Sequence, residues 1–275
     1  MSDDRTVEGR ALERISVARP YFDLRDLDEA GAGIVNATIP NHPTRAPEAG
    51  AIEAAQVARH LAILGSCAAA LTRDDDKRHH YLATRAHYTR MANAPNEAAG
   101  PLRAEAIGSW IDRRTARALA TLSTADGRTL TLLDVEYTVL APRMFARLNP
   151  SIDRAAIDRI EPEAERVRPT AEGLEVDAGP IPLGMCAGHF PDYPAAPVAI
   201  VMGHLCRAAG LTMAHHLGLD GQRYRIEEGR VEATGLAIAG QRLVLRARYA
   251  RPVPGGHRLA GQAVADGLVV GEVDV

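Results

Sequence analysis

The stretch of sequence that decides the fold lies at residues 188–197 and reads GHFPDYPAAP. Its three prolines, Pro191, Pro194 and Pro197, recur at every third position. They hold the backbone extended, because proline fixes its own φ and restricts the residue before it. A long apolar segment follows, from about residue 195 to 217, and predicts a buried helix. The proline run therefore fixes where the side chain of His189 points relative to the start of that helix.

The segments around this helix recur in the other half of the chain. In the second half, strands are expected at 174–176, 223–232, 242–249, 259–265 and 268–275. The first half has the same order, with an apolar helix at 48–71 and strands at 33–39, 81–89, 102–112, 115–123 and 129–139. A charged, apolar-poor segment at 149–170 separates the halves and is interpreted as a linker. The chain is therefore expected to be a tandem repeat.

The two long helices are apolar on most of their circumference, whereas the strands alternate between apolar and polar residues. A helix of this kind needs apolar surface on several sides, and an antiparallel sheet offers one apolar face. We therefore predict an α+β fold in which a curled antiparallel sheet wraps each helix.

The run GHFPDYPAAP resembles the GHFPxxPxxP signature of hotdog-fold β-hydroxyacyl-acyl-carrier-protein dehydratases, in which the signature precedes the central helix. Together with the repeat, the resemblance implies a double hotdog whose two units form a pseudo-dimer. The units are expected at 1–148 and 171–275, joined by the linker 149–170.

The resemblance also implies a site shared between the units. The family carries an acid six residues after its last proline, and that position is Gly203 in the second half. The first half has a shortened copy of the motif, HPTRAP at 42–47, and Glu53 stands six residues after Pro47. In the family, histidine and acid come from different units. The resemblance thus implies one catalytic pair, His189 with Glu53, and one degenerate site with His42 and Gly203.

Dehydration of a 3-hydroxyacyl thioester removes a proton from C2 and protonates the hydroxyl that leaves C3. A neutral histidine and a protonated carboxyl group can perform these two steps, and burial favours both forms. The start of the second helix, at Val198, would bind the thioester carbonyl through backbone N–H groups. Val198 and Glu48 replace the glycine of the family, and Gly50 restores access nearby. Tyr193 either contacts the substrate or covers the helix end.

The expected function is dehydration of 3-hydroxyacyl thioesters to 2-enoyl thioesters, as in fatty acid or polyketide-type biosynthesis. One alternative is a thioesterase in which Glu53 activates water. Another is acyl transfer, because the segments around His42 and Glu53 also resemble butyrolactone synthases. A third is a hotdog protein that binds an acyl carrier without catalysis.

Composition limits the remaining function classes. A net charge of −3, with three Phe and one Trp, argues against nucleic-acid binding. Three widely spaced cysteines suggest neither disulfides nor a zinc site, and no metal or cofactor is expected. No membrane span or signal peptide is expected, so we place the protein in the cytoplasm. The expected partner is an acyl-phosphopantetheine carrier protein or acyl-CoA. Association of two pseudo-dimers into a homodimer stays open.

Overall fold

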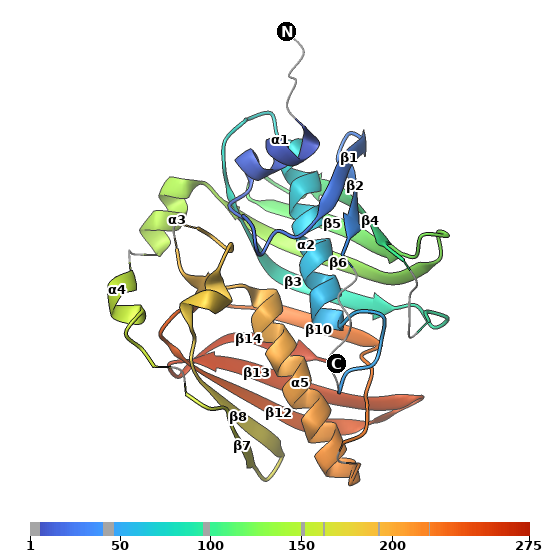
Figure 1. Cartoon of the computed structure of the whole chain (residues 1–275), viewed down its shortest axis with the longest axis vertical. Helices are drawn as coiled ribbons and strands as arrows, with labels where there is room; N and C mark the ends of the chain where they lie inside the picture. Colours follow the sequence, from blue (N-terminus) through green and yellow to red (C-terminus); the bar gives the residue numbers. More distant parts are fainter. Residues whose placement is uncertain are drawn as a thin grey trace.

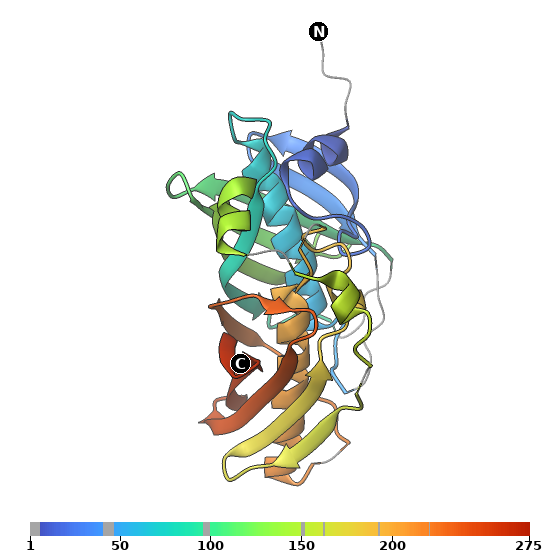
Figure 2. The same ribbon diagram turned by 90° about the vertical axis from the view of Figure 1, so that its left-hand side faces the viewer.

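The computed structural model describes residues 6–40, 47–95, 100–149, 152–161, 163–191, 193–219 and 221–275. They form two units of the same design, one above the other along the long axis of the molecule (Figure 1). Each unit is a curled antiparallel sheet with one long helix packed on it (Figures 1 and 2).

The first unit has its central helix between two early strands and four later ones. Its helices are α1 (Val7–Arg14) and α2 (Ala54–Leu71). Its strands are β1 (Arg25–Gly31), β2 (Ile34–Ile39), β3 (His80–Arg90), β4 (Leu102–Trp110), β5 (Thr115–Ser123) and β6 (Thr129–Leu140). Two short helices follow, α3 (Pro142–Leu148) and α4 (Arg154–Ile157).

The second unit repeats this order. Before its central helix α5 (Val198–Leu217) come β7 (Arg166–Pro169), β8 (Gly173–Pro180), the 3₁₀ turn η1 (Leu183–Cys186) and β9 (Ala195–Ala196). After it come β10 (Glu228–Ala233), β11 (Ala237–Ile238), β12 (Arg242–Val253), β13 (Gly256–Ala265) and β14 (Leu268–Asp274). β9 and β11 form a separate two-stranded ribbon beside the start of α5.

The sheets of the two units join edge to edge. Within the described residues, twelve strands follow one another in the order β1-β2-β4-β5-β6-β3-β10-β14-β13-β12-β8-β7. β3 pairs with β10 antiparallel, with His87 opposite Arg230. From this junction the first unit continues as β3-β6-β5-β4-β2-β1 and the second as β10-β14-β13-β12-β8-β7. The strands at each position are equivalent in the two units, as a pseudo-twofold axis requires. The predicted α+β double hotdog is confirmed.

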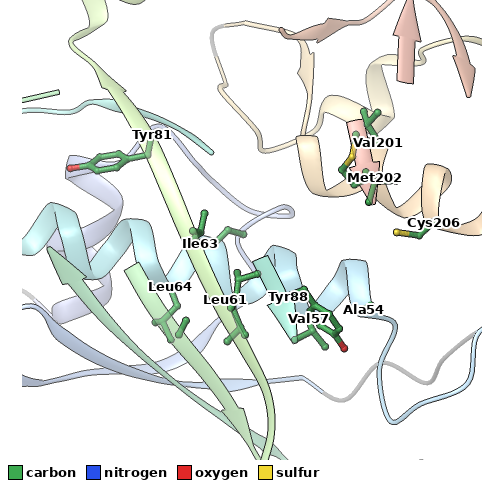
Figure 3. Close-up of a cluster of buried hydrophobic side chains, with 14 of the residues drawn as sticks. Ala54, Val57, Leu61, Ile63, Leu64, Tyr81, Tyr88, Val201, Met202 and Cys206 are labelled. Atoms are coloured by element: carbon green, nitrogen blue, oxygen red, sulfur yellow. The ribbon is translucent and has the colours of Figure 1, made fainter. Parts of the chain in front are cut away.

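The two long helices lie on the same face of this sheet and supply much of its core. Figure 3 shows Val57, Leu61 and Leu64 of α2 and Val201 and Met202 of α5 among the buried apolar side chains. α2 lies so close to β4 that a Cβ added at Gly108 would stand 2.3 Å from the backbone nitrogen of Ala69. Both helices are long and apolar enough to cross a membrane, yet here they pack against a sheet.

The structure differs from the sequence prediction at the helix starts and in the linker. α2 begins at Ala54 rather than near residue 48, and α5 begins at Val198 rather than near 195. Four residues of the expected linker form β7, which pairs with β8 and so belongs to the second sheet. α1, β1 and the ribbon strands lacked a periodic pattern long enough to predict.

Candidate functional site

The N-terminal segment of the chain holds the backbone of the GHFP run in place. The N–H of Ala18 donates to the carbonyl of Gly188 at 2.8 Å, and the N–H of Phe190 donates to the carbonyl of Ser16 at 3.1 Å. Gly188 has a φ of +78°, and an added Cβ would stand 2.4 Å from the carbonyl oxygen of Ala18. A glycine is therefore required where the two segments meet.

His189 has a defined tautomer. Its Nδ1 lies 3.0 Å from the carbonyl oxygen of Ala195. A carbonyl only accepts hydrogen bonds, so Nδ1 carries the proton and Nε2 keeps its lone pair. Desolvation lowers the pKa of His189 to about 4, against a smaller opposing effect of that hydrogen bond. The ring is therefore neutral at pH 7 and able to act as a base.

Aromatic rings surround the imidazole of His189. It stacks on Phe190 at 3.9 Å between ring centroids, and Tyr21 meets it edge-on at 5.2 Å. Phe190 in turn packs edge-on against Phe145. Tyr193 is buried against Phe145 at 5.4 Å. These contacts place Tyr193 in an aromatic cluster with Phe145 of α3 and Phe190, and both roles considered for Tyr193 stay predictions.

His189 lines a cavity of about 290 Å³ between the two units. One wall comes from β3 and β6, and the other from the first turns of α5 and the β10–β11 connection. Val198 lines it together with Val201 and Met202. The described residues that line the cavity include no carboxylate. A larger groove, of about 1060 Å³, runs over the sheet and is lined mainly by charged side chains such as Arg85, Glu136 and Glu232, but it does not contain His189.

The first backbone N–H groups of α5 stand open beside this cavity. The N–H groups of Ile200 and Val201 both donate to the carbonyl of Pro197. In the described part of the chain, those of Val198 and Ala199 donate to no acceptor. Together with the helix dipole they offer a developing oxyanion two donors and a partial positive charge.

The first N–H group of α2 is capped by a carboxylate of the chain. Oε1 of Glu48 accepts a hydrogen bond of 2.8 Å from the N–H of Ala54, the first residue of the helix. Glu48 is 8% exposed, and burial raises its pKa to about 7. Tyr224 of the second unit fixes the loop before the helix, donating through its N–H to Pro47 and accepting from the N–H of Ala49.

Because α2 begins late, the prediction for Glu53 is wrong in one respect. Glu53 is the half-buried residue just before α2 and does not lie inside a helix, as the predicted helix at 48–71 implied. The six residues that follow Pro47 form the loop before α2, which Glu48 and Tyr224 hold in place. Among the described lining residues of the His189 cavity, Glu53 is absent. The structure brings together His189 and Val198 but does not place Glu53 in that cavity.

The remaining predicted residues fall elsewhere. Gly203 faces the other helix, where an added Cβ would stand 3.1 Å from the Cβ of Ala55. Gly50 lies in the loop before α2 and has a φ of +153°. It does not line the His189 cavity in the described structure. His42 lies outside the described residues.

Counted from the helix starts, the residue equivalent to Gly203 is Arg59, which the sequence reasoning did not select. Gly203 is the sixth residue of α5 and Arg59 the sixth of α2. The guanidinium carbon of Arg59 lies 5.6 Å from the ring centroid of Tyr21, and that centroid lies 5.2 Å from the centroid of the His189 ring. Counting residues from Pro47 does not reveal that Arg59 and Gly203 are equivalent, because the equivalence depends on where each helix begins.

Comparison with known proteins supports the fold. No family model matches the chain. Over 98 residues it is 26% identical to the 3-hydroxyacyl-acyl-carrier-protein dehydratase FabZ of Polynucleobacter asymbioticus. The match covers 32% of this chain and 60% of the dehydratase, so the chain spans about three fifths of the length of that curated relative.

Solved structures match over nearly the whole chain. An acyl-ACP thioesterase from Bacteroides thetaiotaomicron superposes with a TM-score of 0.55 at 12% identity, covering 88% of this chain and 97% of its own. A 12:0-ACP thioesterase from Umbellularia californica gives 0.57 at 10%, covering 88% and 92%. A protein of unknown function with a hotdog fold from Alicyclobacillus acidocaldarius gives 0.53 at 12%, covering 94% and 97%. With the repeated strand order and the GHFPDYPAAP run, these matches show that the chain is a tandem hotdog protein resembling the β-hydroxyacyl-acyl-carrier-protein dehydratases.

Proposed function

We propose that the protein hydrolyses acyl thioesters at the N-terminal end of α5. One observation carries the proposal. A neutral histidine with its Nε2 lone pair available lines a cavity beside the open backbone N–H groups of Val198 and Ala199. A general base next to an oxyanion site is the minimum that thioester hydrolysis requires. The thioesterases that share this fold support the proposal.

In the proposed reaction, Nε2 of His189 takes a proton from water while the water oxygen attacks the thioester carbonyl. The negative charge that develops on the carbonyl oxygen is stabilised by the N–H groups at the start of α5. When the tetrahedral intermediate collapses, the carbon–sulfur bond breaks. The imidazolium then returns its proton to the leaving thiolate. The products are a carboxylic acid and a free thiol.

Dehydration is the competing function, and the GHFPDYPAAP run and the match to a dehydratase favour it. That reaction needs a proton donor for the departing hydroxyl group as well as a base. The described lining of the His189 cavity holds no acid, and Glu53 lies outside it. Hydrolysis needs no such second group, which is why we prefer it.

Product analysis separates the two functions. Purified protein is incubated with butyryl-CoA, octanoyl-CoA and 3-hydroxybutyryl-CoA, and the same acyl groups are presented on a phosphopantetheinylated carrier protein. Hydrolysis releases one free thiol per turnover, measured with a disulfide reagent. Dehydration leaves the thioester intact and adds conjugated enoyl absorbance. We expect thiol release from all three acyl groups. Enoyl formation without thiol release would overturn the proposal.

A further inference from the structure

Arg59 is a partly buried cation, and among the described residues the charge of Asp23 acts on it without forming an ion pair. In the described structure no Asp or Glu oxygen lies within 4 Å of its guanidinium, and its buried Nε donates to no acceptor. One terminal nitrogen lies 3.0 Å from Nε2 of His60. Desolvation lowers the pKa of Arg59, against smaller opposing effects of Tyr21 and Asp23. A cation held in this way is stabilised by an anion that binds to it.

The repeat indicates where that anion would lie. Gly203, the sixth residue of α5, faces Ala55, the second residue of α2. By the pseudo-twofold relation between the units, the sixth residue of α2 lies beside the second residue of α5. Arg59 is therefore expected next to Ala199, whose N–H is one of the two open donors, although Arg59 is not among the described residues that line the His189 cavity. The ring of Tyr21, in contact with both Arg59 and His189, joins the same two elements.

We propose that Arg59 binds a carboxylate on the acyl chain of the substrate, so that the preferred substrates are short acyl thioesters with a second, free carboxyl group. This inference rests on the proposed hydrolysis and adds a substrate class to it. A carboxylate accepts two parallel hydrogen bonds from a guanidinium, including one at the unsatisfied Nε. The phosphates of coenzyme A or a carrier protein fit less well, because the whole pantetheine arm separates them from the thioester carbonyl.

The test compares two substrates that differ in one charge. They are the glutaryl thioester of N-acetylcysteamine and its methyl ester, neither of which contains phosphate. For the wild type we expect kcat/KM to be at least about tenfold higher for the charged substrate. In Arg59→Gln this preference should fall to nearly one. Arg207→Gln is the matched control, because Arg207 is exposed on the other helix and already pairs with Glu165 at 2.9 Å. It should keep the preference.

Three results would overturn the proposal. The first is an equal loss for both substrates in Arg59→Gln, which would make the guanidinium an oxyanion donor instead. The second is an unchanged preference in that variant. The third is an effect of Arg59 that appears only with glutaryl-CoA, which would point to phosphate.

A binding measurement keeps the proposal testable if the wild type hydrolyses neither thioester. The thioether S-(4-carboxybutyl)-N-acetylcysteamine is titrated into the wild type and Arg59→Gln in a calorimeter. Binding that the substitution weakens at least about tenfold supports the carboxylate site even though hydrolysis has failed. Equal binding, or none, would overturn it. Thermal melts of both variants exclude loss of folding as the cause.

Discussion

The N-terminal ends of α2 and α5 are equivalent places in a repeated fold, yet they carry opposite chemistry. At α2 a carboxylate of the chain, Glu48, accepts from the first helical N–H group, and we call this capped end the closed end. At α5 the corresponding first N–H group, that of Val198, donates to no acceptor in the described structure, and a neutral His189 and a cavity lie beside it. Gly203 of α5 lies against the second residue of α2, and Arg59 of α2 is proposed to lie beside the second residue of α5. The electropositive end of a helix thus serves capping in one unit and is available for substrate in the other.

This difference shows what a tandem chain permits. Two identical units would have identical helix ends, whereas a fused pair can change each end separately. If one helix end keeps the catalytic group, the other can become a contact that holds the two units together, which we call the joint. Tyr224 illustrates the joint, since it comes from the second unit and holds the loop that precedes α2 in the first. The comparison predicts a single active site per chain, at α5.

Replacing His189 tests the comparison most strongly. His189→Ala should lower kcat/KM for thioester hydrolysis by at least about a hundredfold, the effect of a lost general base. Glu53→Gln should stay within about threefold, because Glu53 does not line the His189 cavity in the described structure. The rate of thiol release measures both. A hundredfold loss in both variants would instead restore the shared pair of His189 and Glu53.

The pH dependence of the wild type tests the state of His189. Burial lowers its pKa to about 4, so the free base is present throughout the neutral range and is lost only as the pH falls through about 4. The acid limb of kcat/KM should lie close to pH 4 and not at the ordinary histidine value of about 6.5. The contribution of neutral His189 to folding stability has the same pH dependence. It is fully present above pH 6.5 and declines as the pH falls toward 4. An acid limb of kcat/KM near pH 6.5 would indicate that His189 is exposed to solvent.

The sequence predicted the fold better than the site. The apolar helices and alternating strands determine the architecture through burial, and the proline run marks the start of α5 to within about three residues. The site depends on where α2 begins, and that is decided by long-range contacts. Glu48 caps Ala54, and Tyr224, nearly 180 residues further on, holds the loop. No local pattern around Glu53 records these contacts, so the count from Pro47 leads to Glu53, just before α2, and not to Arg59, the helix residue equivalent to Gly203.

Tyr224 can be used to perturb the closed end alone. Its ring packs on Gly210 of α5, where an added Cβ would stand 2.1 Å from the ring. Gly210→Ala should therefore destabilise the protein by about 2 kcal/mol, the usual cost of overpacking, despite the higher helix propensity of alanine. Denaturant unfolding measures this. Gly256→Ala is the control, because its added Cβ meets nothing within 4 Å. Similar stability for the two variants would show that Tyr224 is not a tight joint.

Glu48→Gln is expected to have the smallest effect, and it distinguishes the role of the α2 end in stability from the role of the α5 end in catalysis. The amide oxygen can still accept from Ala54, so the cap is retained while the ionisable group is removed. Burial raises the pKa of Glu48 from 4.5 to about 7, so the folded state holds its proton more tightly than the unfolded state. The resulting stability is present below pH 4.5 and is lost as the pH rises through 7.

Relative to the wild type, Glu48→Gln should therefore gain about 2 kcal/mol in unfolding free energy between pH 5 and pH 8. Its rate of thioester hydrolysis should stay within about threefold, because Glu48 stands at the closed end. Urea unfolding at the two pH values measures the first quantity, and thiol release measures the second. A parallel shift of stability at both pH values would mean that Glu48 is ionised throughout. A hundredfold loss of activity would move the reaction to α2 and reverse the assignment of the two ends.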